Sequence, residues 1–295
     1  MEVGRRPLFG EQQRFMLFLI APAALLLLLF QVLPIAIGAN ASFRDWALYN
    51  PKKTWVGLDH YRSVITDPAF LEVVLPNTFI FMALSVAGAL VLGLALALLL
   101  NRPFRGKGVM RAIFLLPMVA TPVAIALVWM MMYNPTLGVM NYLVGLVGLG
   151  PYNWVSNAAI VIPALAVVDT WEWTPLITLI TLAGLATLPV EPYESAQIDG
   201  ASTAQMFWHI TLPLLRPTIV VAVLFRAIDC LKTFDIIYVM TQGGPGFASE
   251  TLNVYTFQVG LFYFHIGYAS SLLVILFALV LGVSLLLIKV RRGSW

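Results

Sequence analysis

The stretch LPVEPYESAQIDGASTAQMFWHITLP, residues 188–213, decides the fold of this chain. It is the most polar run in the second half of the sequence and lies between two apolar segments, 158–187 and 214–241. Across all 295 residues, 60% are hydrophobic and only 11% are charged. A soluble domain could not cover so much apolar surface. The composition therefore predicts an integral membrane protein, with residues 188–213 on one membrane face.

Local signals within residues 188–213 predict two short helices joined by a turn. Pro192 suits the first turn of a helix, where its missing N–H costs nothing. Gly200 would end that helix, because glycine readily adopts the left-handed conformation found after a helix. Ser202 or Thr203 can cap a second helix that runs toward Trp208.

The spacing within this stretch resembles the cytoplasmic "EAA" signature of ABC importer permeases. Three residues separate the triplet 194–196 from Gly200, nine more precede Ile210, and one precedes Leu212 and Pro213. Every fixed position fits except Ser195, where the family usually has Ala. The resemblance implies that the loop docks into a cleft of an ATPase subunit, with Glu194 facing that subunit. The residues expected to take part in coupling are Glu191, Glu194, Ser195, Ala196, Asp199, Gly200, Ile210, Leu212 and Pro213.

Apolar runs of about 20 residues are long enough to span a bilayer. The sequence predicts an all-α protein with six such spans: 15–38, 77–100, 112–132, 158–187, 214–241 and 265–288. The fourth and fifth contain charges, which weakens their hydropathy signal. The first is longer than the roughly 7–15 apolar residues of a signal peptide, so it is interpreted as an uncleaved anchor. Pro117 and Pro122 should bend the third.

Basic residues set the orientation of a membrane protein, because Lys and Arg accumulate in its cytoplasmic loops. With six spans, most of them fall on the side of residues 188–213: Arg5, Arg6, Arg14, Arg102, Arg105, Lys107, Arg111, Arg216, Lys289, Arg291 and Arg292. We therefore predict a cytoplasmic N-terminal segment 1–14, a cytoplasmic loop 188–213 and a cytoplasmic tail 289–295. The net charge of +3 reflects topology rather than binding to nucleic acid.

Three further stretches resemble the carbohydrate-uptake branch of these permeases. They are residues 55–61 (WVGLDHY), residues 234–245 (FDIIYVMTQGGP) and residues 267–270 (GYAS). The resemblance covers roughly residues 12–290 and implies a type I ABC importer fold in a bacterial or archaeal plasma membrane. It also implies a second, homologous permease subunit, two ATPase subunits and an extracytoplasmic substrate-binding protein as partners.

Charged residues within the fourth and fifth predicted spans require an explanation, because ionisable groups in a membrane usually face a partner or a water-filled cavity. Two sets follow the helical spacing i, i+3, i+4, i+7, which places each set on one helix face. One set is Asp169, Glu172, Trp173 and Leu176, and the other is Arg226, Asp229, Cys230 and Thr233. Aligning the chain with the maltose permease on Glu194 places both sets at that protein's sugar-contacting positions, although the residue types differ.

The alternative for these charges is internal pairing at i, i+3, of Arg226 with Asp229 and of Lys232 with Asp235. The roles of Lys232 and Asp235 stay open, with a structural role favoured. His60, His209 and His265 are isolated in the sequence and are interpreted as interfacial residues. Cys230 is the only cysteine, which excludes an internal disulfide.

A sugar or polyol suits the predicted site, because carboxylates accept hydrogen bonds from hydroxyls and aromatic rings pack on sugar rings. Glycerol phosphate or another small polar solute remains an alternative, but a phosphorylated substrate would require more unpaired cations. The chain has no Walker sequence, so ATP and Mg would be bound by the partner ATPases and not by this chain. An intramembrane enzyme using Asp169 and Glu172 lacks a positioned nucleophile, and a secondary transporter would require an inverted repeat that is not seen.

Overall fold

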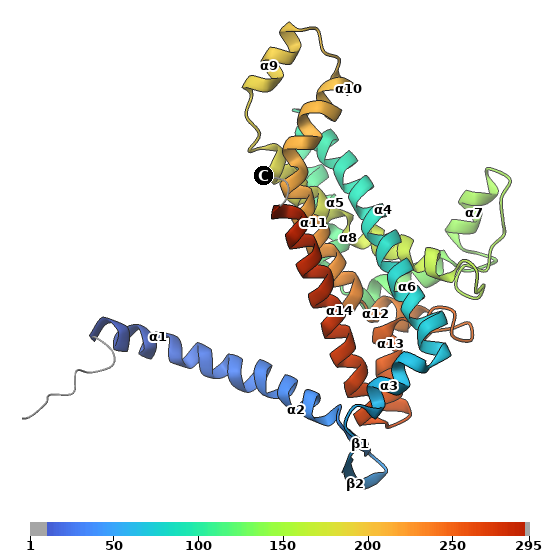
Figure 1. The fold of residues 1–295 in the computed structure, drawn as a ribbon. Helices are drawn as coiled ribbons and strands as arrows, with labels where there is room; N and C mark the ends of the chain where they lie inside the picture. Colours follow the sequence, from blue (N-terminus) through green and yellow to red (C-terminus); the bar gives the residue numbers. More distant parts are fainter. Residues whose placement is uncertain (1–10, 293–295) are drawn as a thin grey trace, which may run out of the picture.

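The computed structural model describes residues 11–292, which form a mainly helical bundle with one small sheet (Figure 1). Most of the predicted N-terminal segment 1–14, including Arg5 and Arg6, lies outside the described residues, as do residues 293–295 of the predicted tail.

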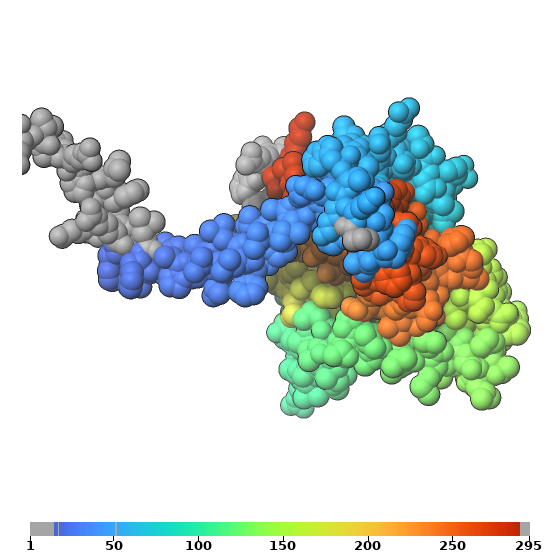
Figure 2. All heavy atoms as spheres, turned by 90° about the horizontal axis from the view of Figure 1, so that it is seen from below, coloured from blue at the N-terminus to red at the C-terminus, as the bar shows by residue number. Residues whose placement is uncertain are grey.

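The first helical segment projects from the bundle as an arm, residues 11–41. It consists of α1 (Glu11–Leu27), a π-helical turn η1 (Leu28–Val32) and α2 (Leu33–Ala41). Its apolar part, Phe18–Ala41, is long enough to cross a membrane and includes most of the predicted first span. Apart from the contacts of α2 with α14 and β1, the arm extends away from the rest of the described chain (Figures 1 and 2). An apolar helix of this length requires lipid or another subunit around it.

A two-stranded hairpin follows the arm at the far end of the bundle from residues 188–213 (Figure 1). Strand β1 (Arg44–Ala47) pairs antiparallel with β2 (Asn50–Trp55), and α3 (Asp59–Thr66) continues the chain. The backbone of Arg44 approaches Gly267 so closely that any side chain at Gly267 would collide with it. The glycine therefore allows the hairpin to lie against the start of α14.

Two long helices form the centre of the bundle: α4 (Leu75–Asn101), which follows a π-helical turn η2 (Phe70–Val74), and α8 (Val161–Leu185). They pack along most of their length. A Cβ atom at Gly93 would lie 2.6 Å from Cγ2 of Ile177, and one at Gly88 would lie 2.7 Å from Oγ1 of Thr170. Small residues at these contacts let the two backbones approach, as is common between membrane helices.

The predicted third span, 112–132, is sharply bent. It consists of α5 (Lys107–Val119) and α6 (Pro122–Met132), whose axes differ by 97°. Pro122 begins α6 and Pro117 lies inside α5, so the bend occurs where the two prolines predict it. A short helix, α7 (Val139–Gly145), forms in the connecting segment that follows.

The predicted fifth span, 214–241, differs from the structure. Instead of one helix there are two, α11 (Leu212–Lys232) and α12 (Asp235–Thr241), with a break at Thr233 and Phe234. Thr233 has ψ of 127° and so leaves the helical region. Hydropathy could not reveal this break, because α12 is as apolar as the helix before it and packs on α6.

The chain ends with α13 (Leu252–Phe257), a π-helical turn η4 (Gln258–Phe262) and α14 (Ile266–Arg292). Within residues 11–292, three helical segments are long and apolar enough to cross a membrane: Phe18–Ala41, Phe70–Asn101 and Ile266–Lys289. The bent pair α5 and α6 would make a fourth. Helices α8 and α11, which contain buried charges, are not among these apolar segments. The count of six spans therefore stays a prediction.

Candidate functional site

Residues 188–213 form the predicted helix–turn–helix. Helix α9 (Glu191–Ile198) has Pro192 in its first turn, and Gly200 follows it with φ of 75°. Ser202 caps α10 (Thr203–Met206) in a capping box with Gln205, in which each side chain bonds the other residue's backbone N–H. A π-helical turn η3 (Phe207–Thr211) leads into α11. The three predictions of a proline start, a glycine stop and a Ser202 cap are confirmed.

The loop 188–213 exposes apolar as well as acidic side chains. Val190, Ile198 and Trp208 are exposed at 63%, 87% and 63% of their surface. Glu194 and Asp199 are exposed beside them. The loop extends from the bundle at the same end as the C-terminal end of α14 (Figure 1). Large apolar side chains gathered on an exposed loop are typical of a surface that contacts another protein.

The loop is tied to the bundle at its base, where the Tyr193 hydroxyl donates a 3.0 Å hydrogen bond to Oγ1 of Thr211. Of the residues predicted to take part in coupling, Ala196, Ile210 and Leu212 are partly buried, whereas Glu191, Ser195 and Pro213 are exposed. The loop therefore has an exposed tip and a fixed base, joined directly to α8 and α11.

A buried arginine connects the two helices that flank this loop. Arg226 on α11 forms an ion pair with Oδ2 of Asp169 on α8, and both side chains are fully buried. Its other terminal nitrogen donates to Oδ2 of Asp229 at 2.7 Å. The ring of Trp173 lies 5.3 Å from the guanidinium carbon. The two sets of residues that share the spacing i, i+3, i+4, i+7 therefore meet between α8 and α11.

The structure divides the eight predicted substrate residues into two groups. Asp169, Glu172, Arg226 and Cys230 are buried within the chain. Trp173, Leu176, Asp229 and Thr233 are partly exposed. In this conformation only the second group can contact a solute, and the first group forms the layer behind it. Of the three acids considered for substrate contact, Asp229 alone reaches the surface, with 39% of its side chain exposed.

Among residues 11–292, three polar atoms in the buried layer have no hydrogen-bond partner, namely Oδ1 of Asp169, Oε2 of Glu172 and Nε of Arg226. A buried polar atom without a partner costs about 1–3 kcal/mol, and more when it is charged. These atoms therefore have free capacity for hydrogen bonds to water.

The two pairings considered as the structural alternative have different outcomes. Arg226 and Asp229 pair as the i, i+3 spacing predicts. Lys232 and Asp235 do not form an ion pair within the described residues, and both are exposed. The helix break after Lys232 removes the helical geometry that the second pairing requires.

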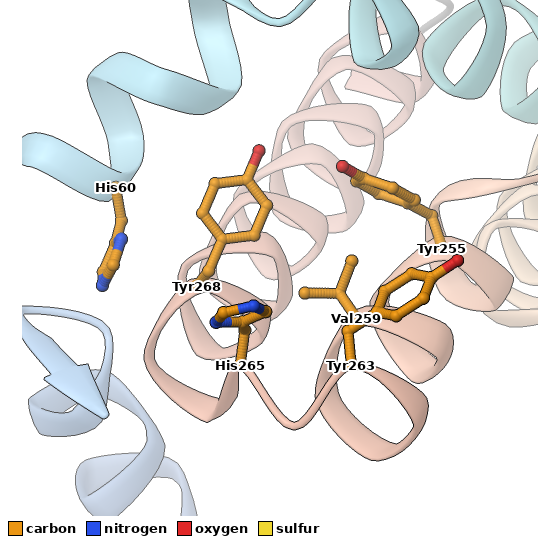
Figure 3. Close-up of a pocket in the computed structure, with 6 residues that line it drawn as sticks. All are labelled: His60, Tyr255, Val259, Tyr263, His265 and Tyr268. Atoms are coloured by element: carbon orange, nitrogen blue, oxygen red, sulfur yellow. The ribbon is translucent and has the colours of Figure 1, made fainter. Parts of the chain in front are cut away.

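A pocket at the hairpin end of the bundle was not predicted from the sequence. It has a volume of about 580 Å³ and is lined by His60, Tyr255, Val259, Tyr263, His265 and Tyr268 (Figure 3). The ring of His60 meets that of Tyr268 edge-on at 5.8 Å. His60 and His265, which are isolated in the sequence, therefore line the same pocket, and their interfacial position stays a prediction. They come from segments about 200 residues apart, so no local signal could have brought them together.

The chain matches a family of transport proteins over residues 89–291, which is more than half of its length. That family is described as the binding-protein-dependent transport system inner membrane component. The chain belongs to this family. It is thus a permease subunit of an ABC transporter in the inner membrane, and not an enzyme.

The permease has relatives along almost its whole length. It is 37% identical to the trehalose/maltose transport system permease protein MalF of Thermococcus litoralis, over 93% of this chain and 92% of that one. It is 34% identical to the trehalose transport system permease protein SugA of Mycobacterium tuberculosis, over 94% and 89%.

A solved structure supports the fold of the permease. A chain from a bacterial ABC transporter that imports the acidic polysaccharide alginate superposes with a TM-score of 0.81 over 96% of both chains, at 23% identity. A second structure of an alginate transporter contains a pentasaccharide-bound periplasmic protein. The permease therefore has the type I importer fold, as the sequence predicts.

Proposed function

We propose that this permease imports a sugar or polyol into the cytoplasm, driven by ATP hydrolysis in partner ATPase subunits that dock on the loop 188–213. The observation that carries the proposal is the exposed loop, whose tip presents apolar and acidic side chains to solvent in the described structure. The loop connects α8 and α11 along the chain. A displacement of the loop by the ATPase subunit would therefore move the two helices that contain the predicted substrate residues.

The substrate class is supported by the relatives' names and by the exposed side of the α8–α11 site. Asp229 can accept hydrogen bonds from hydroxyls, the Thr233 hydroxyl can donate or accept, and the Trp173 ring offers an apolar face. Together these groups suit a ring with both hydroxyls and C–H faces. Glycerol phosphate fits less well, because the arginine of the site is already paired.

The arm, residues 11–41, supports the assembly with a second permease subunit. Its large apolar side chains are exposed; for example, Phe18 and Phe30 are 76% and 77% exposed. We propose that a homologous subunit and lipid cover it. An extracytoplasmic binding protein would deliver the solute to the end that carries the hairpin, and both termini would be cytoplasmic.

Two substitutions in the loop test the proposal. Glu194→Lys reverses an exposed charge at the expected ATPase contact, and Gly200→Asp strains a residue with φ of 75°. Both variants should insert in the membrane but lose uptake and retain less ATPase on copurification. Asp59→Lys makes the same charge reversal in the exposed part of α3, at the other end of the bundle, and should retain the ATPase on copurification. Full ATPase retention by both loop variants would contradict the docking role.

A further inference from the structure

We infer that the site between α8 and α11 admits neutral sugars and excludes acidic ones, because its arginine is already paired with two carboxylates of the same chain. This inference rests on the proposed function and specifies the substrate class at the site. It is not a property of the fold, since a transporter with the same fold imports an acidic polysaccharide.

The first step is that Arg226 is not available to a substrate. Its side chain has no exposed surface. One terminal nitrogen donates to Asp169 and the other to Asp229, and the remaining Nε is closed to a solute because the side chain is fully buried. Arginine recognises carboxylates and phosphates mainly through such paired hydrogen bonds. An incoming anion would have to displace one of these two partners.

The second step concerns the side that a solute meets. Asp229 covers the end of Arg226 and is 39% exposed, so the carboxylate is presented in place of the guanidinium. The Thr233 hydroxyl donates a 3.3 Å hydrogen bond to the backbone oxygen of Asp229. This bond holds the Thr233 side chain beside the last turn of α11, next to Asp229. An ionised carboxylate only accepts hydrogen bonds. The site therefore favours a solute that donates them, such as a sugar with free hydroxyls.

The third step is the charge behind this surface. Asp169 and Glu172 lie in the buried layer with Asp229 at its edge, and Arg226 is the single cation among them. Even if Glu172 is uncharged, the two carboxylates of Asp169 and Asp229 surround the single guanidinium of Arg226, which leaves a net negative charge. The carbonyl end of α11 lies beside Asp229 and adds partial negative charge.

Two exposed charges near the site must also be considered. Lys232 lies one turn after Asp229, but it forms no ion pair in the described structure and stays in solvent. Asp235 is exposed just beyond the helix break and opposes the charge of Lys232. Both charges are exposed to water, whose dielectric constant of about 80 makes their effect on the buried layer weaker than that of the buried groups themselves.

The size of the effect follows from Coulomb's law. Two like charges about 7 Å apart, at an effective dielectric constant of about 20, repel enough to weaken binding by more than tenfold. Methyl α-glucoside and methyl α-glucuronide differ only in the carboxylate at C6. We therefore expect the glucuronide to bind at least about tenfold more weakly than the glucoside.

The experiment uses the full complex of permeases and ATPases in nanodiscs, without the binding protein, so that selection by that protein plays no part. Saturation-transfer NMR measures binding of methyl α-glucoside, methyl α-glucuronide, trehalose and maltose. Asp229→Asn removes the exposed negative charge with little change in shape, and Asp229→Ser also uncovers Arg226. Both variants should reduce the preference for the neutral glycoside by about tenfold. Asp235→Asn is the matched control and should leave it unchanged.

Three results would overturn the inference. The first is wild-type binding of the glucuronide as tight as that of the glucoside, which leaves the proposed sugar import standing. The second is an unchanged preference in both Asp229 variants, which would place the selection elsewhere. The third is the absence of binding by all four sugars, which would contradict the sugar site of the proposed function as well.

Discussion

Removing Arg226 should destabilise the permease far more than removing the charge of its exposed partner. Arg226 and Asp169 are both fully buried, whereas Asp229 has 39% of its side chain exposed. Arg226→Gln leaves Asp169 as a buried carboxylate without a cation. Asp229→Asn leaves Arg226 still paired with Asp169, and an amide oxygen still accepts its hydrogen bond.

Breaking a buried pair by removing one partner costs about 3–5 kcal/mol. The pair of Arg226 with Asp229 is open to solvent on the side of Asp229, so its contribution is closer to the roughly 1 kcal/mol of an exposed pair. A domain of 150–250 residues loses about 2–4 °C in Tm per kcal/mol. Arg226→Gln should therefore lower the Tm on the order of 10 °C, and Asp229→Asn by only about 2–4 °C.

The assay is the thermal loss of the monodisperse peak of the purified complex in gel filtration. The double variant Arg226→Gln with Asp169→Asn should recover most of the loss, because it removes the buried charge that the single variant leaves. The reasoning would be refuted if Arg226→Gln were no more harmful than Asp229→Asn. Failure of the double variant to recover any stability would refute it too.

Three other predictions follow from single features. Gly93→Leu should prevent the close packing of α4 on α8, since even a Cβ would lie 2.6 Å from Ile177. The yield of folded complex should therefore fall. Gly282 has open space around it, so Gly282→Leu should leave the yield unchanged. Burial raises the pKa of Glu250 to about 7. The folded chain then binds more protons than the unfolded chain between about pH 4.5 and 7, so stability falls as pH rises through this window and the loss is complete above it. Glu250→Gln should therefore raise the Tm at pH 8 and not at pH 4.5, and an equal shift at both would contradict the assignment. Finally, cysteines placed at Gln205 and Asn50 should react with impermeant reagents from the cytoplasm and from outside, respectively; labelling of both from one side would overturn the predicted topology.

The loop 188–213 could be predicted from sequence because its signals are local. Pro192, Gly200 and Ser202 each act on the backbone within a few residues, so no knowledge of the remaining fold is needed. The pairing of Arg226 with Asp229 could be predicted for the same reason, because the spacing i, i+3 within one helix is also a local signal.

Other features depend on how distant segments pack. The ion pair of Arg226 with Asp169 requires the relative rotation of α8 and α11, which periodicity within each helix does not specify. The break at Thr233 is not marked by glycine or proline, and the apolar composition continues beyond it. The pocket at the hairpin end joins His60 to residues of α13, η4 and α14, and the approach of the hairpin to Gly267 brings these segments together.

The right-angled bend between α5 and α6 has a consequence for the surrounding membrane. At 1.5 Å per residue, 13 and 11 residues make rods of about 20 and 16 Å. Joined at 97°, they reach only about 24 Å from end to end, which is less than the roughly 30 Å thickness of the hydrocarbon core. The bend also frees backbone carbonyls near Ala120, which hydrocarbon cannot satisfy. Lipid alone is therefore an unsuitable neighbour here, and the bilayer must be locally thinned or replaced by protein or water.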